Sequence, residues 1–310
     1  MNTASLKIPS LWGYLQLMRP ANIVTAWADI LAGFAASGSV VALNSAIAGQ
    51  ATLATLEPLP WLLLATTGLY GGGIVFNDVF DAQLDAKEHP ERPIPSGRAS
   101  PQGATLLGSL LLLVGVLAAA QVSLFSALIA AIVASAALFY DAWGKHNPLS
   151  GPLNMGLCRG GNLLLGLSAV PALVVERWFL ALIPIFYIAA VTTISQGEVH
   201  GGKSRTGVLA LLMLGIVLGG ISALGILPDY SLIDALPFLA LLAGRVLPPF
   251  IQSTRNPNPE LIQTAVKTGI ISLILLNAIA AAGFAGWFYG LLVLLLLPIS
   301  IGLARLFAVT

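Results

Sequence analysis

Charged residues are scarce in this chain of 310 residues, because Asp, Glu, Lys and Arg together make up only 9% of it. Soluble proteins contain about 25%, so the composition argues against a soluble globular domain. Hydrophobic residues make up 57% of the chain. This predicts an all-α polytopic membrane protein, built from spans of about 20 apolar residues. The net charge of +1 argues against a nucleic-acid partner.

Cysteine is nearly absent as well. Cys158 is the one cysteine, which excludes an intramolecular disulfide. A cleavable signal peptide is also not expected. The first apolar run contains Arg19, Asn22 and Asp29 and continues too long for such a leader.

Apolar segments fill most of the chain, and we interpret ten of them as membrane spans. Proline, glycine and charged residues mark most of the boundaries between them. The predicted spans are 20–42, 60–76, 103–120, 122–141, 153–174, 178–196, 207–227, 234–252, 263–283 and 287–307. No domain boundary interrupts them, so we predict a single integral membrane domain over residues 1–310.

Basic residues are distributed unevenly between the predicted loops. Loops after odd-numbered spans contain only Arg177 as a basic residue, whereas most other basic residues belong to the loops after even-numbered spans or to the chain ends. The basic residues outside odd-numbered loops include Lys7, Arg19, Lys87, Arg92, Arg98, Lys145, Lys203, Arg205, Arg255, Lys267 and Arg305. The positive-inside rule therefore predicts that both termini are cytoplasmic. We expect a multi-pass protein of a bacterial inner membrane.

Residues 77–85 contain an unusual concentration of amide and carboxylate side chains. On a helix, Asn77, Asp81 and Asp85 are spaced i, i+4, i+8 and project from one face. Crowded carboxylates repel one another unless a cation lies among them, and Mg²⁺ commonly joins one or two carboxylates to substrate phosphates. The pattern predicts a magnesium–phosphate site at the membrane surface, with Asp78 as a further contributor.

A proline-rich loop follows this acidic segment. Its three prolines, at 90, 93 and 95, prevent a continuous helix and stiffen the loop. Arg92 and Arg98 can pair with phosphate oxygens in a forked geometry. The alternative is a solvated loop whose basic residues only set the topology.

Residues 77–85, followed by Arg-Pro-Ile-Pro-Ser-Gly at 92–97, resemble the first aspartate-rich motif of the UbiA superfamily of intramembrane prenyltransferases. The likeness is strongest to members that prenylate hydroxyl acceptors, and it covers about residues 15–285. Three further segments are similar in the expected order: Arg19-Pro20-Ala21-Asn22; Tyr140, Lys145 and Gly161-Asn162; and Glu198 followed by Gly202-Lys203-Ser204-Arg205-Thr206.

The resemblance implies nine core spans around a cavity that opens toward the lipid, where Mg²⁺ holds a prenyl diphosphate for attack by an acceptor. The implied metal ligands are Asn77, Asp81, Asp85 and Glu198. The implied catalytic residues are Asp78, Asp81, Asp85 and Lys145. The implied substrate-binding residues are Asn22, Arg92, Arg98, Asn162, Arg159, Lys203 and Arg205.

The chain departs from the family pattern at two places. Residues 194–200 contain Glu198 as the only acid where the family places two or three aspartates, although Gln196 and His200 offer other polar groups. Three explanations of this reduced second motif are open: one metal ion suffices, the leaving group is held in a different way, or this member of the family has lost catalysis. The tenth span, 287–307, exceeds the nine of the family and is interpreted as peripheral or oligomeric.

Polar residues inside predicted spans are costly and tend to face an internal cavity. Asp29 and Arg159 either pair across the bundle or recognise a polar acceptor, and we favour acceptor or cavity roles for Asn22, Arg159 and Asn162. Asp141 is either a base for the acceptor or a residue that ends a helix, and the second reading is slightly favoured.

We therefore predict an enzyme that transfers a prenyl group from a prenyl diphosphate to an acceptor, with a hydroxyl such as that of a polyol or cyclitol favoured over an aromatic ring. A non-catalytic membrane component that binds or moves a lipid-linked or hydrophobic metabolite is the main alternative. A secondary transporter is disfavoured, because its ligands would concentrate near the midplane of the membrane.

Overall fold

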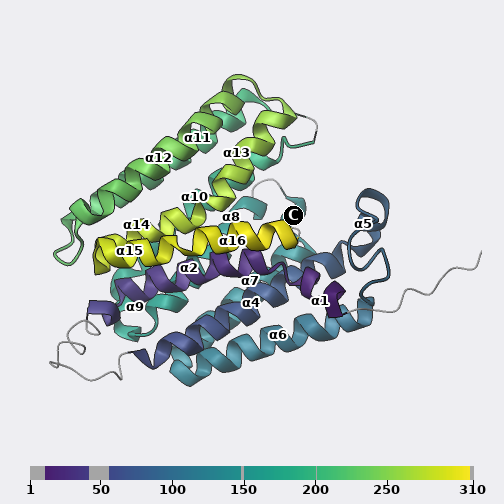
Figure 1. Cartoon of the computed structure of the whole chain (residues 1–310), viewed down its shortest axis with the longest axis horizontal. Coiled ribbons are helices and arrows are strands. Elements are labelled where there is room, and N and C mark those ends of the chain that lie inside the picture. Colours follow the sequence, from purple (N-terminus) through teal and green to yellow (C-terminus); the bar gives the residue numbers. More distant parts are fainter. Residues whose placement is uncertain (1–10, 42–55, 148–149, 200, 308–310) are drawn as a thin grey trace, which may run out of the picture.

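The computed structural model describes residues 11–41, 56–147, 150–199 and 201–307, and within these ranges the chain is helical without a strand. The helices form an elongated bundle in which most axes run nearly antiparallel (Figure 1). Lys7 and His200, which entered the sequence interpretation, lie outside the described residues.

The α-helices follow one another along the chain. They are α1 (Leu11–Leu17), α2 (Pro20–Ala36), α4 (Pro58–Phe80), α5 (Ala82–Glu88), α6 (Pro101–Val122), α7 (Leu124–Ala142), α8 (Ser150–Leu167), α9 (Pro171–Arg177), α10 (Leu182–Ser195), α11 (Ser204–Ala223), α12 (Leu232–Arg255), α13 (Pro259–Ile271), α14 (Leu273–Ala285), α15 (Trp287–Leu294) and α16 (Leu296–Leu306). Short 3₁₀ turns occur at Gly144–His146, Trp178–Ala181 and Leu224–Ile226.

Eight helical segments of the described chain are long and apolar enough to cross a membrane. Together with their large exposed hydrophobic side chains, they make this an integral multi-pass membrane protein. The predicted spans that are not among the eight correspond to α2, which has 17 residues, and to α8, which contains Arg159 and Asn162. The count of nine spans plus a tenth stays a prediction, as does the single domain over residues 1–310.

The predicted boundary between the fifth and sixth spans was wrong. α8 ends at Leu167, and the apolar segment Pro171–Ser195 continues as the next span. The turn between them is stabilised by Ser168, whose hydroxyl donates to the carbonyl of Leu165 at 2.7 Å. Pro171 then begins α9, because proline lacks the N–H that a first-turn residue leaves unused.

Two glycines let α2 and α8 approach closely. A Cβ on Gly33 would collide with the backbone of α8 at the Leu163 carbonyl and the Leu167 N–H, and a Cβ on Gly166 would collide with the carbonyl of Ile30. Small residues at such contacts are how membrane helices pack backbone against backbone. This contact fixes the wall of the bundle that contains Asp29.

We expect Gly33→Ala to destabilise the folded protein by about 1–3 kcal/mol or more, because backbone atoms cannot move aside as flexible side chains do. Thermal unfolding in detergent, followed by circular dichroism, measures the loss. Gly219→Ala is the matched control, since a Cβ on Gly219 meets no atom within 4 Å. Equal midpoints for the two variants would contradict the expected backbone contact.

The C-terminal helices α15 and α16 pack along the outside of the bundle core. α15 lies against α14, and α16 lies against α2, where the hydroxyl of Ser300 donates to the carbonyl of Ala21 at 3.1 Å. Near the end of the described chain, the ring of Phe307 contacts the ring of Trp12 with centroids 4.8 Å apart. The C-terminal segment is therefore two helices packed against the core.

Candidate functional site

A cavity of about 400 Å³ lies between the helices of the bundle. Its polar lining comes mainly from residues at or near helix ends, namely the start of α2, the end of α4 and the end of α7. The polar lining residues are Arg19, Asn22, Tyr70, Asn77, Arg92, Tyr140, Asp141 and Arg159. The apolar ones include Leu69, Ile74, Val133, Met155, Ile188, Ile270 and Leu273.

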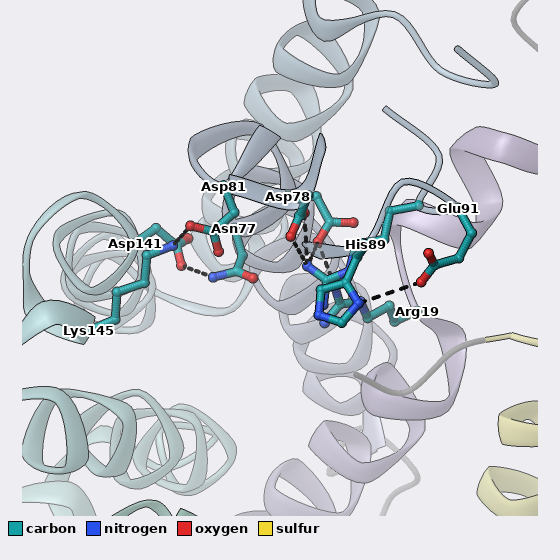
Figure 2. A network of polar contacts seen from close by, with 10 residues as sticks. Arg19, Asn77, Asp78, Asp81, His89, Glu91, Asp141 and Lys145 are labelled. Atoms are coloured by element: carbon teal, nitrogen blue, oxygen red, sulfur yellow. Dashed lines mark hydrogen bonds and ion pairs between the residues drawn. The ribbon is translucent and has the colours of Figure 1, made fainter. Parts of the chain in front are cut away.

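One polar group joins the end of α4 to the end of α7. The amide of Asn77 donates to Asp141 at 2.9 Å, and the ammonium of Lys145 lies 2.5 Å from Asp81 (Figure 2). Asp141 is buried, whereas the side chain of Asp81 is 19% exposed. Predicted site residues from two separate sequence motifs thus meet at this point, and Asp141 joins them.

A second polar group lies on the other side of the acidic segment. Asp78 binds the guanidinium of Arg19 at 2.6 Å, and Nη1 of Arg92 lies 2.8 Å from both carboxylate oxygens of Asp85. The same Nη1 lies 3.9 Å from Asp78, so Arg92 connects the two acids. Figure 2 shows Asp78 and Arg19 apart from the group around Asp81 and Lys145.

Asn77, Asp81 and Asp85 were predicted to share one helix face, but their side chains do not converge on one point as three ligands of a metal would. The backbone keeps helical hydrogen bonds through this stretch. The N–H of Asp81 donates to the backbone carbonyl of Asn77 at 3.0 Å, and the N–H of Asp85 donates to the backbone carbonyl of Asp81 at 2.8 Å. α4 nevertheless ends at Phe80 and α5 begins at Ala82. The side chains then turn to different cations, and no three carboxylates, histidines or cysteines of the described chain converge as a metal-binding group.

Arg19 has an unusual backbone conformation. Its φ of 44° is the only positive value for a non-glycine residue in the described ranges, and such a conformation costs about 1–3 kcal/mol unless surrounding contacts fix it. Arg19 directly precedes Pro20, which begins α2. The ion pair with Asp78 fixes the side chain where it lines the cavity.

Sequence reasoning did not include Arg19 or Tyr70 among the predicted site residues. Arg19 belongs to the quoted Arg-Pro motif, which was the available signal. Tyr70 is seven residues before Asn77, a spacing that places both on one face of a helix. Its ring lies under the guanidinium of Arg159, 4.6 Å from the centroid.

Asp29 is the centre of a fully buried polar network. It accepts hydrogen bonds from Arg159 at 2.9 Å, Asn162 at 3.0 Å and Asn277 at 2.6 Å. Arg159 also donates to the hydroxyl of Thr25 at 2.7 Å. These contacts tie α2, α8 and α14 together. Of this network, Arg159 also lines the cavity.

Arg98, a predicted substrate contact, holds the proline-rich loop in place. Its guanidinium donates to the side chain of Gln16, to the backbone carbonyl of Glu91 and to Ser96. The loop turns at Gly97, where φ is 76°. Arg98 is not among the residues that line the cavity, whereas Arg92 is.

The second predicted motif is separate from the cavity lining. Glu198 is half-buried, and burial raises the pKa of its carboxyl above the usual value, an effect that Lys267 partly offsets. Lys203 and Arg205 are exposed and form no ion pair with the described residues. Within the described residues, no hydrogen bond or ion pair joins these side chains to the acids of the first motif.

The donor chemistry near Asn77 fits a magnesium ion. Asn77 keeps its side-chain carbonyl oxygen while its amide binds Asp141, and Asp81 contacts Lys145 through one carboxylate oxygen. Mg²⁺ is usually held by one or two carboxylates together with substrate phosphates. A cage made wholly of protein ligands is therefore not required.

Comparison with known proteins places this arrangement in context. A model of the UbiA prenyltransferase family matches residues 38–261. The digeranylgeranylglyceryl phosphate synthase of Methanothrix thermoacetophila is 31% identical over 250 residues, which cover 74% of this chain and 86% of that protein. Among solved structures, a UbiA homolog from Aeropyrum pernix K1 is similar with a TM-score of 0.65 and 16% identity, covering 82% of this chain and 96% of that one.

A UbiA homolog from Archaeoglobus fulgidus bound to GPP and Mg²⁺ has the same fold, with a TM-score of 0.52 and 15% identity. The match covers 94% of this chain and 99% of that one. The fold expected from the sequence, a helical membrane bundle of this type, is thereby confirmed.

Proposed function

This chain belongs to the UbiA prenyltransferase family, and we propose that it transfers a prenyl group from a prenyl diphosphate to the hydroxyl of an acceptor with the help of Mg²⁺. The observation that carries the proposal is that Asn77 and Asp141 line the polar part of the cavity, while the ion pair of Asp81 and Lys145 lies beside them (Figure 2). The relative from M. thermoacetophila, a digeranylgeranylglyceryl phosphate synthase, supports it.

Cations around the polar end of the cavity suit a diphosphate. Arg19 and Arg92 line the cavity, and Lys145 lies beside Asp81. As the bond between the prenyl carbon and the diphosphate oxygen breaks, negative charge grows on the leaving group, and fixed cations stabilise it most at the transition state. When bound, Mg²⁺ supplies further Lewis-acid stabilisation of that charge.

The apolar depth of the cavity suits the isoprenoid chain. Leu69, Ile188 and Leu273 line it from three different helices. Burial of a prenyl chain against such side chains contributes about 25 cal/mol for each Å² removed from water. Binding energy from the unreactive tail then positions the reacting carbon beside the polar end.

The acceptor is proposed to be an alcohol of the polyol or cyclitol kind. Its oxygen bonds to the prenyl carbon, its proton leaves, and diphosphate departs. Asn22 and Arg159 line the cavity and are the proposed acceptor contacts. Asn162 lies behind them in the Asp29 network. Asp141 lines the cavity beside Tyr140, which supports a role toward the acceptor in addition to its place at the end of α7.

Several earlier expectations stay predictions. They are the contact of Arg98, Lys203 and Arg205 with substrate, the metal role of Glu198, and the location of both termini on the cytoplasmic side of a bacterial inner membrane. The alternatives of a metabolite-binding component or a transporter are not favoured by any contact in the described chain.

Release of pyrophosphate from geranylgeranyl diphosphate by the purified protein in detergent tests the proposal. We expect release that requires both Mg²⁺ and an added alcohol such as glycerol 1-phosphate or its prenyl ether. An aromatic acid supplied in place of the alcohol is expected to give at least about tenfold less product, a difference of about 1.4 kcal/mol in the barrier. Equal rates with EDTA and with Mg²⁺, or a preference for the aromatic acid, would contradict the proposal.

A further inference from the structure

Asp85 is a poor candidate for a metal ligand in the position that it occupies. Its carboxylate is almost completely buried, with 4% of the side chain exposed, and both oxygens accept from Nη1 of Arg92 at 2.8 Å. A buried carboxylate needs a partner of opposite charge, and Arg92 already provides it. Binding a divalent cation at Asp85 would require displacing that guanidinium.

Asp78 has the same kind of arrangement with another arginine. Its side chain is also 4% exposed, and it binds Nη2 of Arg19 at 2.6 Å. The left-handed backbone of Arg19, with φ of 44°, is stabilised by this contact across 59 residues of sequence. Without Asp78, the strained backbone would lose the partner that orients its side chain.

Both arginines keep donors for a ligand. A guanidinium has five N–H donors, and the contacts with the two acids use Nη1 of Arg92 and Nη2 of Arg19. Both side chains line the cavity. Asp78 and Asp85 contact these arginines but are not themselves among the lining residues.

Asp81 differs from these two acids in its exposure and in its partner, although it too is not among the residues that line the cavity. Its side chain is 19% exposed, its partner is a flexible lysine, and the contact involves one carboxylate oxygen. Asn77 and Asp141 lie beside it (Figure 2). The acidic segment thus separates into a side that offers oxygens to a metal and a side whose oxygens are occupied by guanidinium groups.

We propose that Asp78 and Asp85 are positioning residues that hold Arg19 and Arg92 against the cavity for the diphosphate, while the metal is held on the Asn77 and Asp81 side. This inference rests on the proposed function, and it narrows the metal ligands expected from the sequence. Asp85 then acts on the substrate only through Arg92.

A double-mutant cycle tests this statement, because two residues that act through one contact give non-additive effects. We expect Asp85→Asn to weaken binding of geranylgeranyl diphosphate by about tenfold or more, the loss of one charge-assisted hydrogen bond. In an Arg92→Gln background, the same Asp85→Asn change should add less than about twofold. Isothermal titration of the full chain in detergent measures each affinity.

Metal binding is the second readout, and it does not depend on turnover. Mn²⁺ bound to the protein is measured by electron paramagnetic resonance, with geranylgeranyl diphosphate saturating and no acceptor present. Asp85→Asn should retain the Mn²⁺ affinity of the wild type, whereas Asp81→Asn should lose it. Glu88→Gln, an exposed acid on the same short helix α5, is the matched control and should change neither measurement.

Loss of Mn²⁺ binding in Asp85→Asn, or multiplicative effects of Asp85→Asn and Arg92→Gln, would overturn the inference alone. If the wild type binds neither Mn²⁺ nor geranylgeranyl diphosphate, the proposed function fails together with it. If Asp85→Asn does not fold, the cycle is run with Asp78→Asn and Arg19→Gln, for which the same non-additivity is expected.

Discussion

Asp81→Ala is expected to lower kcat/KM for prenyl transfer by about 10³-fold, a loss typical of removing a group that stabilises transition-state charge. Asp81 is the partly exposed carboxylate beside Asn77, and it also holds the ammonium of Lys145 at 2.5 Å. Its removal takes away a metal oxygen and frees the lysine from its position. Pyrophosphate release over a range of Mg²⁺ concentrations measures the loss.

Glu176→Ala is the matched control for this variant. Glu176 is an exposed acid on α9 and is not among the residues that line the cavity. Its activity should equal that of the wild type. Wild-type activity in folded Asp81→Ala protein would show that the proposed catalytic group lies elsewhere.

Asp29→Ala is expected to destabilise the folded protein by about 3–5 kcal/mol, because it leaves the guanidinium of Arg159 buried without its counterion. Asp29 is fully buried and also accepts from Asn162 and Asn277, so three helices lose a common contact. Thermal unfolding followed by circular dichroism in detergent measures the change.

The double variant Asp29→Leu, Arg159→Met separates the cost of the unpaired charge from the loss of packing. Replacing a whole buried ion pair by apolar residues is often neutral or stabilising, so the double variant should recover much of the lost stability. If it is no more stable than Asp29→Ala alone, the ion pair is not the source of the effect.

Much of the fold was predictable, because long apolar segments in a bilayer have few alternatives to helices. All ten predicted spans are helical over most of their described length. The boundary error near residues 168–170 has a local cause. Ser168 is a single small polar residue in a long hydrophobic run, so the sequence does not mark it as a helix end. Its hydroxyl nevertheless bonds the carbonyl of Leu165 and the hydroxyl of Ser126, and these contacts stabilise a turn.

The sequence indicated part of the candidate site, but it did not indicate how the residues of that part pair with one another. Helical spacing correctly placed Asn77, Asp81 and Asp85 on successive turns, which depends only on the backbone. Which cation each acid binds depends on helices that are distant in sequence, such as Lys145, which is 64 residues from Asp81. A helical periodicity contains no information about those partners, so the division of the acids appears only in three dimensions.

The contact between Trp12 and Phe307 brings the first and last parts of the described chain together at one end of the bundle. A polypeptide that begins and ends on the same side of a bilayer must cross it an even number of times. Removal of the last crossing would therefore transfer the C-terminus to the opposite compartment, whatever the absolute orientation. A C-terminal reporter fused after residue 286 and one fused after residue 310 should report from opposite compartments.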